Sequence, residues 1–206
     1  MKRGFDLICA LFGLLALSPV LVLSALAIKL DTRGPVFFRQ ERVGRNFKMF
    51  RIFKFRTMHA GREEGPPVTA SGDDRITGTG RFLRKYKLDE LPQLINVLKG
   101  EMSLVGPRPE VPRYVEMFRP AYEKLLSVRP GITDPASLGF SNEEELLMPN
   151  GGAEQDYIRK MLPEKIRLSS EYIDRMGLLA DFKIILRTLG NIWLSYPVRR
   201  GGQENR

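Results

Sequence analysis

The chain begins with a long apolar stretch. Between Leu7 and Ile28 the only polar side chains belong to Ser18 and Ser24, and about 20 apolar residues in a helix cross the ~30 Å hydrocarbon core of a bilayer. The stretch is longer than the roughly 7–15 apolar residues of a secretory signal. The pattern therefore predicts a membrane helix.

Ser18 and Pro19 lie in the middle of this stretch. Proline lacks a backbone donor and pushes the carbonyl of Leu15 out of its helical hydrogen bond. The hydroxyl of Ser18 could satisfy that carbonyl instead. The pair predicts a break in the membrane helix.

Basic residues stand on both sides of the stretch, with Lys2 and Arg3 before it and Lys29 and Arg33 after it. Because Lys and Arg flanking a membrane segment tend to stay on the cytoplasmic side, both ends are expected there. A broken, re-entrant helix agrees with this charge pattern and with the proline. Prolines also occur in spanning helices, so a single-pass anchor remains the alternative.

The pattern changes after the membrane segment. Residues 36–58 are rich in Phe and Val and alternate partly with a period of two on each side of Gly44-Arg45-Asn46, which is typical of a β-hairpin. Residues 61–80 are rich in Gly, Pro, Ser and Asp and are expected to form a loop. Helical patterns are then expected at 81–98, 111–127 and 154–176.

The last helical pattern has apolar residues at the spacing of one helix face: Phe182, Ile185, Leu186, Leu189, Ile192 and Trp193. Such a face could belong to the core. With Trp193 at its end and basic residues beside it, it could also lie in the headgroup layer of a bilayer. The fold class predicted from all these patterns is α+β, mostly helical, with a β-hairpin and amphipathic helices around one catalytic core.

Composition and charge add information mainly about the binding partners of the protein. The 206 residues suit one domain with a membrane anchor, and the net charge of +9 indicates an anionic partner. Nucleic acid, an acidic bilayer and phosphorylated substrates all fit that charge, so an anchored binding protein without catalysis is an alternative. No nucleic-acid-binding module is recognisable, so no nucleic acid is expected. The single cysteine, Cys9, is expected to be a packing residue.

Two adjacent acids, Asp89 and Glu90, form the first group of residues that could carry chemistry. Pro92 follows them, and proline is tolerated in the first turn of a helix, so Asp89 could stand at a helix start. If the helix instead runs through from Arg81, Pro92 must kink it. An isolated Asp-Glu pair is more often a cap and a solvated charge.

Cations elsewhere in the chain change that interpretation. Lys54 and Arg56 end the expected hairpin, Arg84 lies shortly before the acids, and Arg108 stands between two prolines. Arginine binds phosphate oxygens through its planar fork, and carboxylates are suitable ligands for Mg²⁺. The combination predicts a site that binds a polyphosphate and transfers a phosphoryl group.

At this point the sequence resembles a known family, the monotopic phosphoglycosyl transferases or bacterial sugar transferases. The resemblance covers nearly the whole chain and rests on Ser18-Pro19 and four ordered segments: Phe53–Met58, Leu88–Gly100, Met102–Pro109 and Arg129–Thr133. No single segment would suffice.

The resemblance implies a mechanism and its substrates. Asp89 would attack the sugar-bearing phosphate of a UDP-sugar, expel UMP and become a phosphosugar-aspartate. Polyprenol (undecaprenyl) phosphate would then take the sugar phosphate. Glu90 would accept a proton or, with Asp89, hold Mg²⁺, and phosphate contacts are expected from five cations: Lys54, Arg56, Arg84, Arg108 and Arg129.

The resemblance also implies a location and an organisation. Residues 1–33 are expected to form the re-entrant helix, with its break at Ser18 and Pro19, residues 34–200 the cytoplasmic catalytic domain and residues 201–206 a tail. The protein would lie at the cytoplasmic face of the bacterial inner membrane as the minimal catalytic form. It could form a homo-oligomer. After Thr133 the chain departs from the family pattern over residues 134–138, so the sugar is left open.

Three remaining features have ordinary explanations. His59, the only histidine, is expected to be polar surface, and Trp193 is expected to be a packing or interface residue. The run Glu143-Glu144-Glu145 is expected to be a solvated helix start.

Overall fold

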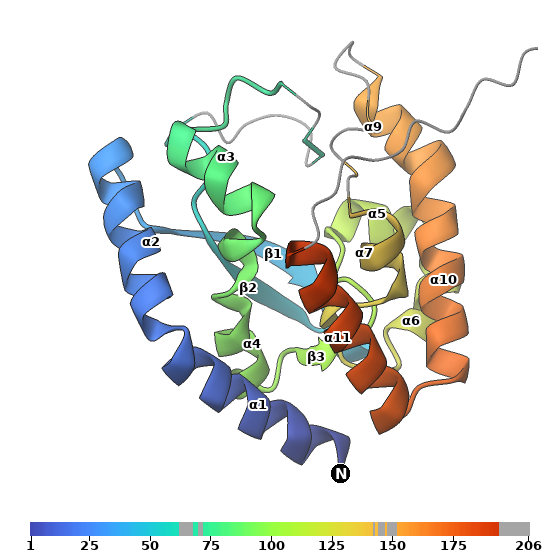
Figure 1. Ribbon diagram of the computed structural model, residues 1–206. Helices are drawn as coiled ribbons and strands as arrows, with labels where there is room; N and C mark the ends of the chain where they lie inside the picture. The colour runs from blue at the N-terminus through green and yellow to red at the C-terminus, as the bar shows by residue number, and fades with distance from the viewer. Residues whose placement is uncertain (62–67, 70–71, 142, 144–146, 148–151, 194–206) are drawn as a thin grey trace, which may run out of the picture.

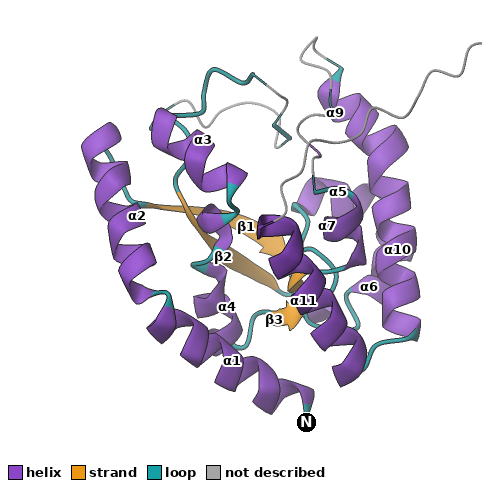
Figure 2. Ribbon diagram, in the orientation of Figure 1, coloured by secondary structure: helices purple, strands orange, loops and turns teal. Residues whose placement is uncertain are grey.

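The computed structural model describes residues 1–61, 68–69, 72–141, 143, 147 and 152–193. Helices surround two small sheets, so the predicted class of mixed helix and strand is confirmed (Figures 1 and 2). A bent pair of helices lines one side of the molecule, and helices from the last third of the chain cover the other side (Figure 1).

The apolar N-terminal stretch forms two helices, α1 (Lys2–Ala16) and α2 (Ser18–Asp31), which meet at an angle of 60°. The hydroxyl of Ser18 donates a 2.8 Å hydrogen bond to the carbonyl of Leu15. This is the carbonyl that was predicted to lose its helical hydrogen bond because of Pro19. Within the described residues no single helix is long and apolar enough to cross a bilayer. The bent pair is long and apolar enough when both helices are taken together.

Polar contacts fix the start of α1 to the rest of the molecule. Lys2 forms an ion pair with the buried Asp181, Arg3 donates to the carbonyl of Val97 at 2.7 Å, and the carboxylate of Asp6 accepts from Ser103 at 2.8 Å. No local sequence pattern indicates these three contacts, because each links residues about 90 or more positions apart.

The predicted hairpin is confirmed. Strands β1 (Phe37–Val43) and β2 (Met49–Phe55) pair antiparallel in a register that places Phe37 opposite Phe55. The short 3₁₀ turn η1 (Arg45–Phe47) joins them, and Asn46 takes a φ of 56°, a backbone conformation that asparagine tolerates better than most residues.

Two predicted helices are each divided in the structure. Residues 81–98 form α3 (Gly78–Lys85), the 3₁₀ turn η2 (Leu88–Glu90) and α4 (Gln93–Lys99). Residues 111–127 form α5 (Pro112–Met117) and α6 (Arg119–Leu125). The first break lies at Lys87, which takes a left-handed conformation with a φ of 54°, and the second at Phe118, with a φ of −118° and a ψ of 29°. Pro92 and Pro120 then stand at the start of the next helix, where a missing backbone donor costs little.

A second, parallel sheet lies beside these helices. It pairs β3 (Ser103–Val105) with β4 (Gly131–Thr133). The chain continues through α7 (Pro135–Gly139), α9 (Ala153–Asp156), the π-helical turn η3 (Tyr157–Met161), α10 (Leu162–Asp174) and α11 (Leu178–Trp193). The predicted helices at 154–176 and 182–193 are thus found. The acidic run at 143–145 lies largely outside the described residues.

The predicted apolar face of α11 points mainly outward. Phe182, Leu186 and Leu189 are each 52% exposed, whereas Asp181 and Ile184 are buried. A core role for that face is therefore wrong for these three residues. Asp181 forms an ion pair with Lys2 and accepts a hydrogen bond from Tyr172, so the buried face of α11 lies one position earlier than the predicted stripe.

Candidate active site

The two acids lie in a break between helices. Lys87 takes a left-handed conformation with a φ of 54°, which ends α3, and η2 then presents Asp89 and Glu90 before Pro92 caps α4. Of the two alternatives from the sequence, the structure is closer to a helix start than to a kinked through-helix. The break places the two carboxylates beside side chains from other segments.

Glu90 is held by two cations. Lys54 Nζ, from β2, lies 2.8 Å from Glu90 Oε1, while Arg108 donates to Oε1 at 2.5 Å and to Oε2 at 3.2 Å. Burial alone would raise the pKa of Glu90, but Arg108 and Lys54 outweigh burial and hold it well below its usual value. Glu90 is therefore ionised, and both of its oxygens are occupied.

Asp89 is in a different state. Asp89 is 8% exposed. Among the residues that the structure describes, its carboxylate has no hydrogen-bond or ion-pair partner. Burial, together with the charge of Glu90, raises the pKa of Asp89 to about 6, against the opposing effect of Lys54, Arg84 and Lys87. At neutral pH this carboxylate is largely ionised, poorly solvated and unusually basic, which are the properties of a good oxygen nucleophile.

Arg84 reaches the same site from α3. Its Nε donates to the hydroxyl of Thr57 at 3.0 Å, and its charge is close enough to lower the pKa of Asp89. This packing depends on Gly80, because a Cβ at that position would lie 2.1 Å from the carbonyl oxygen of Thr57. Gly80 therefore allows α3 to lie directly on the chain that leaves β2, which the sequence did not indicate.

The turn that carries Arg108 is fixed from both sides. Gly131 donates to the carbonyl of Pro107 at 2.9 Å, and a Cβ on Gly131 would lie 2.1 Å from the nitrogen of Gly106, so only glycine fits. Beyond the turn, Glu110 accepts a 2.5 Å hydrogen bond from Tyr157 and pairs with Arg42. These contacts hold the chain on both sides of Arg108, whose guanidinium donates to Glu90.

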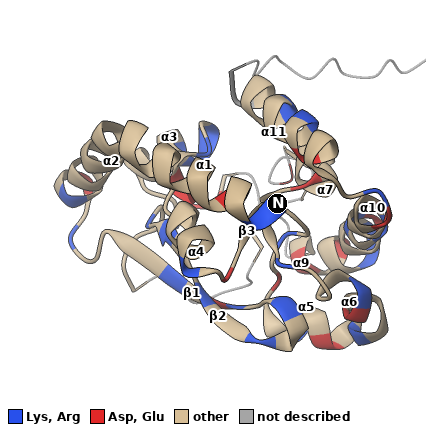
Figure 3. Cartoon of the chain, turned by 90° about the horizontal axis from the view of Figure 1, so that it is seen from below, with Lys and Arg blue, Asp and Glu red and all other residues tan. Residues whose placement is uncertain are grey.

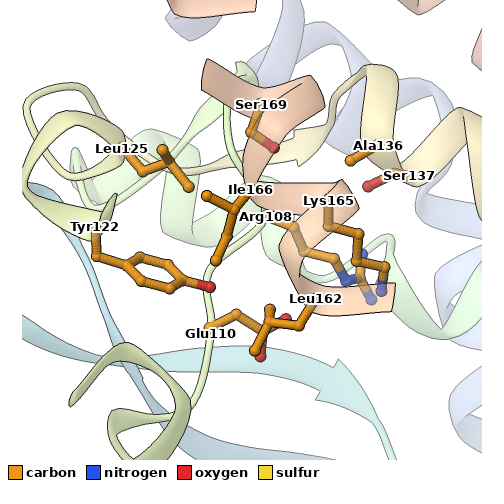
Figure 4. A pocket seen from close by; sticks show the side chains of 10 residues that line it. All are labelled: Arg108, Glu110, Tyr122, Leu125, Ala136, Ser137, Leu162, Lys165, Ile166 and Ser169. Atoms are coloured by element: carbon orange, nitrogen blue, oxygen red, sulfur yellow. The ribbon is translucent and has the colours of Figure 1, made fainter. Parts of the chain in front are cut away.

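A pocket borders Arg108 between α6, α7 and α10, with an empty volume of about 300 Å³ (Figure 4). Lys165 lines it, forms an ion pair with Glu143 and lies over the ring of Tyr157. The buried hydroxyl oxygen of Ser137, which also lines the pocket, has no hydrogen-bond partner in the described structure. Ala136 and Ser137, within the stretch 134–138 where the chain departs from the family pattern, thus line the same pocket as Arg108.

Two of the predicted phosphate-binding arginines are not brought to the acids. The buried guanidinium of Arg56 donates to the carbonyls of Thr32 and Arg33, just after the end of α2. Arg129 donates to the carbonyl of Gly100, beyond the far end of α4, whose seven residues span about 10 Å. Arg56 thus binds the segment that follows α2, and Arg129 binds the residue that follows α4. A sequence motif alone does not show whether an arginine has such a structural role or binds phosphate.

The donor set at the dyad fits a magnesium ion that is bound jointly with a phosphate. Mg²⁺ in such sites takes one or two carboxylates together with substrate phosphates. Asp89 offers both oxygens, whereas those of Glu90 face Lys54 and Arg108. No cluster of three or more His, Cys, Asp or Glu able to hold a metal occurs in the described ranges, so a fully protein-bound metal is not supported there.

Comparisons of the sequence with known proteins point to one family. The family model described as bacterial sugar transferase matches residues 1–195. The chain is 42% identical over 196 residues to an undecaprenyl-phosphate glucose phosphotransferase of Komagataeibacter xylinus, with 91% of the chain and 35% of that protein covered.

Two further relatives carry related names. A UDP-glucose:undecaprenyl-phosphate glucose-1-phosphate transferase of Caulobacter vibrioides is 41% identical, over 93% of the chain and 69% of that protein. An N-acetylgalactosaminephosphotransferase of Aeromonas hydrophila that acts on UDP-N-acetylgalactosamine and undecaprenyl phosphate is 38% identical, over 97% of the chain and 45% of that protein. The chain spans less than half of the first and third of these relatives.

Proposed function

The chain belongs to the bacterial sugar transferase family, and from that premise we propose that it moves a sugar 1-phosphate from a UDP-sugar to undecaprenyl phosphate. The names of its relatives supply the two substrate classes. The observation that carries the proposal is Asp89, a buried carboxylate with a pKa of about 6 that feels the charges of Lys54 and Arg84. It stands next to Glu90, which holds Lys54 and Arg108.

In the first half-reaction, an oxygen of Asp89 attacks the phosphorus that bears the sugar. A bond forms between Asp89 and this phosphorus, the bond to the bridging oxygen breaks, and UMP leaves with that oxygen and its electron pair. Because charge spreads over the phosphoryl oxygens in the transition state, fixed cations accelerate the step. Arg108 and Lys54 are held in place by Glu90 and need little rearrangement to supply this charge.

In the second half-reaction, a phosphate oxygen of undecaprenyl phosphate attacks the same phosphorus. The bond to Asp89 breaks, and the carboxylate is regenerated as the polyprenyl diphosphate sugar forms. The attacking phosphate oxygen is already ionised and needs no general base. Glu90, whose pKa is held well below its usual range, therefore serves to position Arg108 and Lys54 rather than to take up a proton.

Mg²⁺ is the cofactor we propose, with Asp89 as its ligand from the dyad and substrate phosphates completing the site. When bound, the ion would neutralise charge on the diphosphate and leaving UMP. It would also favour the ionised form of Asp89.

We place the protein at the cytoplasmic face of the bacterial cytoplasmic membrane, with residues 1–33 as a re-entrant segment and residues 34–200 as the catalytic domain. Large apolar side chains of the bent pair are exposed, among them Leu11, Phe12, Leu15, Leu23 and Leu26. Figure 3 shows little charge along the pair, with basic residues towards its ends. Exposed apolar surface of this extent favours contact with hydrocarbon, and the outward face of α11 adds to it.

The test of the function is a UMP-release assay on purified protein in lipid nanodiscs. With undecaprenyl phosphate, Mg²⁺ and a panel of UDP-sugars, we expect release with at least one donor and loss of release when EDTA removes the metal. Restoring Mg²⁺ controls for damage by the chelator. Absence of UMP with every donor, with the protein folded and metal present, would contradict the proposal.

The re-entrant arrangement is testable by labelling from the two sides of the membrane. In a Cys9→Ser background, Gly4→Cys near the start of α1 and Arg33→Cys after α2 both offer exposed positions. Because both ends are proposed to lie in the cytoplasm, an impermeant maleimide should label neither in intact spheroplasts and both after lysis. Labelling of Gly4→Cys alone in intact spheroplasts would indicate a spanning helix.

A further inference from the structure

Arg108 borders the pocket of Figure 4 as well as Glu90. One face of α10 lines this pocket with four residues at helical spacing: Leu162, Lys165, Ile166 and Ser169. The empty volume of about 300 Å³ is at the lower end of the ~300–1,000 Å³ range of small-molecule pockets. In Figure 4 the side chains of Arg108 and Lys165 point toward the same end of the pocket. A molecule whose phosphate contacts Arg108 can therefore place its next ring in this space.

Ser137 brings an unpaired hydroxyl to the pocket. The buried carboxylate of Asp134 accepts hydrogen bonds of 2.7 Å from the backbone nitrogen of Ser137 and from the hydroxyl of Ser169, and so fixes α7 against α10. The hydroxyl oxygen of Ser137 is buried but has no hydrogen-bond partner among the described residues. Because buried polar groups are nearly always hydrogen-bonded, this hydroxyl favours a polar ligand.

Lys165 brings a buried cation to the same pocket. It is 7% exposed and forms an ion pair with Glu143. An ammonium has three donors and a carboxylate accepts several hydrogen bonds, so the pair suits the hydroxyl groups of a sugar. The ammonium also lies 4.7 Å from the ring centre of Tyr157 and 5.8 Å from that of Phe140. The ring faces beside Lys165 are thus covered and do not offer the stacking surface that a nucleobase uses.

The geometry of the proposed reaction indicates which part of the donor enters the pocket. In phosphoryl transfer the attacking and leaving oxygens lie roughly in line through the phosphorus. Asp89 and the UMP oxygen take those two positions, so the oxygen that joins the sugar lies to the side, with the phosphoryl oxygens that fixed cations stabilise. Arg108 is one of these cations and lines the pocket. The sugar, rather than the uridine, therefore branches toward it.

We propose that this pocket binds the sugar of the donor, and that Ser137 and Lys165 select the sugar by contacting its hydroxyl groups. The inference rests on the proposed function and adds its specificity-determining residues. A site built to hydrogen-bond a hydroxyl discriminates against a sugar that lacks it, because the polar groups of the site then stay unpaired.

Ser137→Ala tests the assignment without removing any hydrogen bond of that hydroxyl to the described part of the protein. The assay is single-turnover UMP release without acceptor, with the UDP-hexose that reacts fastest in the panel. We expect the second-order rate constant for the donor to fall about fivefold in Ser137→Ala and about 10- to 100-fold in Lys165→Met, because a hydrogen bond from a charged donor contributes more. The unfolding temperature of Ser137→Ala should not fall. Ser127→Ala, which removes a surface hydroxyl outside the pocket, is the control and should keep the wild-type rate.

Monodeoxy analogues of the same UDP-hexose identify the contact. One analogue should react about fivefold more slowly than the parent donor with wild-type protein, and should show no further loss with Ser137→Ala. If the losses add for every analogue, or if both variants keep the wild-type rate constant, the pocket assignment is overturned while the function stands.

Inhibition by UMP separates the sugar from the uridine. UMP carries uridine without a sugar, so its inhibition constant should be the same in wild type, Ser137→Ala and Lys165→Met. Weaker inhibition by UMP in the two variants would place the nucleotide in the pocket and overturn the assignment. If wild-type protein releases no UMP from any UDP-sugar, the function itself fails.

Discussion

Asp89→Asn is expected to abolish UMP release, with a loss of at least about 10⁴-fold. The substitution removes the nucleophilic carboxylate and keeps the size and shape of the side chain. Incubation of wild-type protein with a UDP-sugar should give a mass increase of one phosphosugar on the peptide that contains Asp89, and the variant should give none. Full activity in Asp89→Asn would refute the covalent role.

The same substitution is expected to stabilise the folded protein. An aspartate has a pKa near 3.9 in an unfolded chain, and in the folded protein that of Asp89 is raised to about 6 by burial and by Glu90. Because the pKa of Asp89 is higher in the folded than in the unfolded chain, the folded state is most stable below about pH 4, and this stability is lost as the pH rises through about 6. At pH 8 the ionised Asp89 therefore costs on the order of 2–3 kcal/mol, which the neutral asparagine avoids.

Unfolding in detergent at pH 8 and pH 4 measures this effect. Asp89→Asn should unfold at a higher temperature than wild type at pH 8, and most of the difference should be lost at pH 4, where Asp89 is neutral in the folded protein. An equal gain at the two pH values would show that charge is not the cause. A gain in stability with complete loss of activity is expected where a nucleophile is held in an unfavourable environment.

Glu90→Gln is the second substitution with a large expected effect. The amide cannot neutralise Lys54 and Arg108, which both contact this carboxylate. Loss of one partner from a buried ion pair costs about 3–5 kcal/mol, and we expect the lower end because 35% of the Arg108 side chain is exposed. Activity should fall on the order of 10²-fold as the two cations lose their fixed positions.

The pH dependence of the Glu90→Gln variant distinguishes a positioning role from a proton-accepting role. In wild type, activity should fall as pH drops through about 6, where Asp89 becomes protonated. Because the charge of Glu90 contributes to the raised pKa of Asp89, its removal should move this acid limb to lower pH. If the residual activity keeps its limb near pH 6, or becomes independent of pH there, Glu90 acts in another way. Glu101→Gln, which alters a carboxylate hydrogen-bonded to Asn96 and Lys99, serves as a control.

Local rules fixed the parts of the fold that short stretches of chain can decide. Proline lacks a backbone donor in any context, so the break at Pro19 and its compensation by Ser18 follow from the sequence alone. The alternation around Gly44 predicted the hairpin in the same way. Asp89, Glu90 and Arg108 were recognisable because they stand in motifs whose spacing is visible in the sequence.

Long-range contacts decided what the sequence left open. Lys54, Glu90 and Arg108 lie 36 and 18 positions apart, and only folding shows that they form one ion-pair network. Arg56 and Arg129 stand in equally suggestive motifs, yet their donors face carbonyls at the ends of α2 and α4. A motif identifies which residue type is present, but not which partner the fold offers it.

The sequence by itself determined the bent apolar segment, the hairpin and the identity of the reactive acids, since each depends on residue chemistry and near-neighbour geometry. Only the tertiary structure decided the different states of the two acids. Adjacent carboxylates with similar intrinsic pKa values become a paired anion and an unpaired, basic one, because burial and charge at each oxygen depend on side chains brought from distant segments.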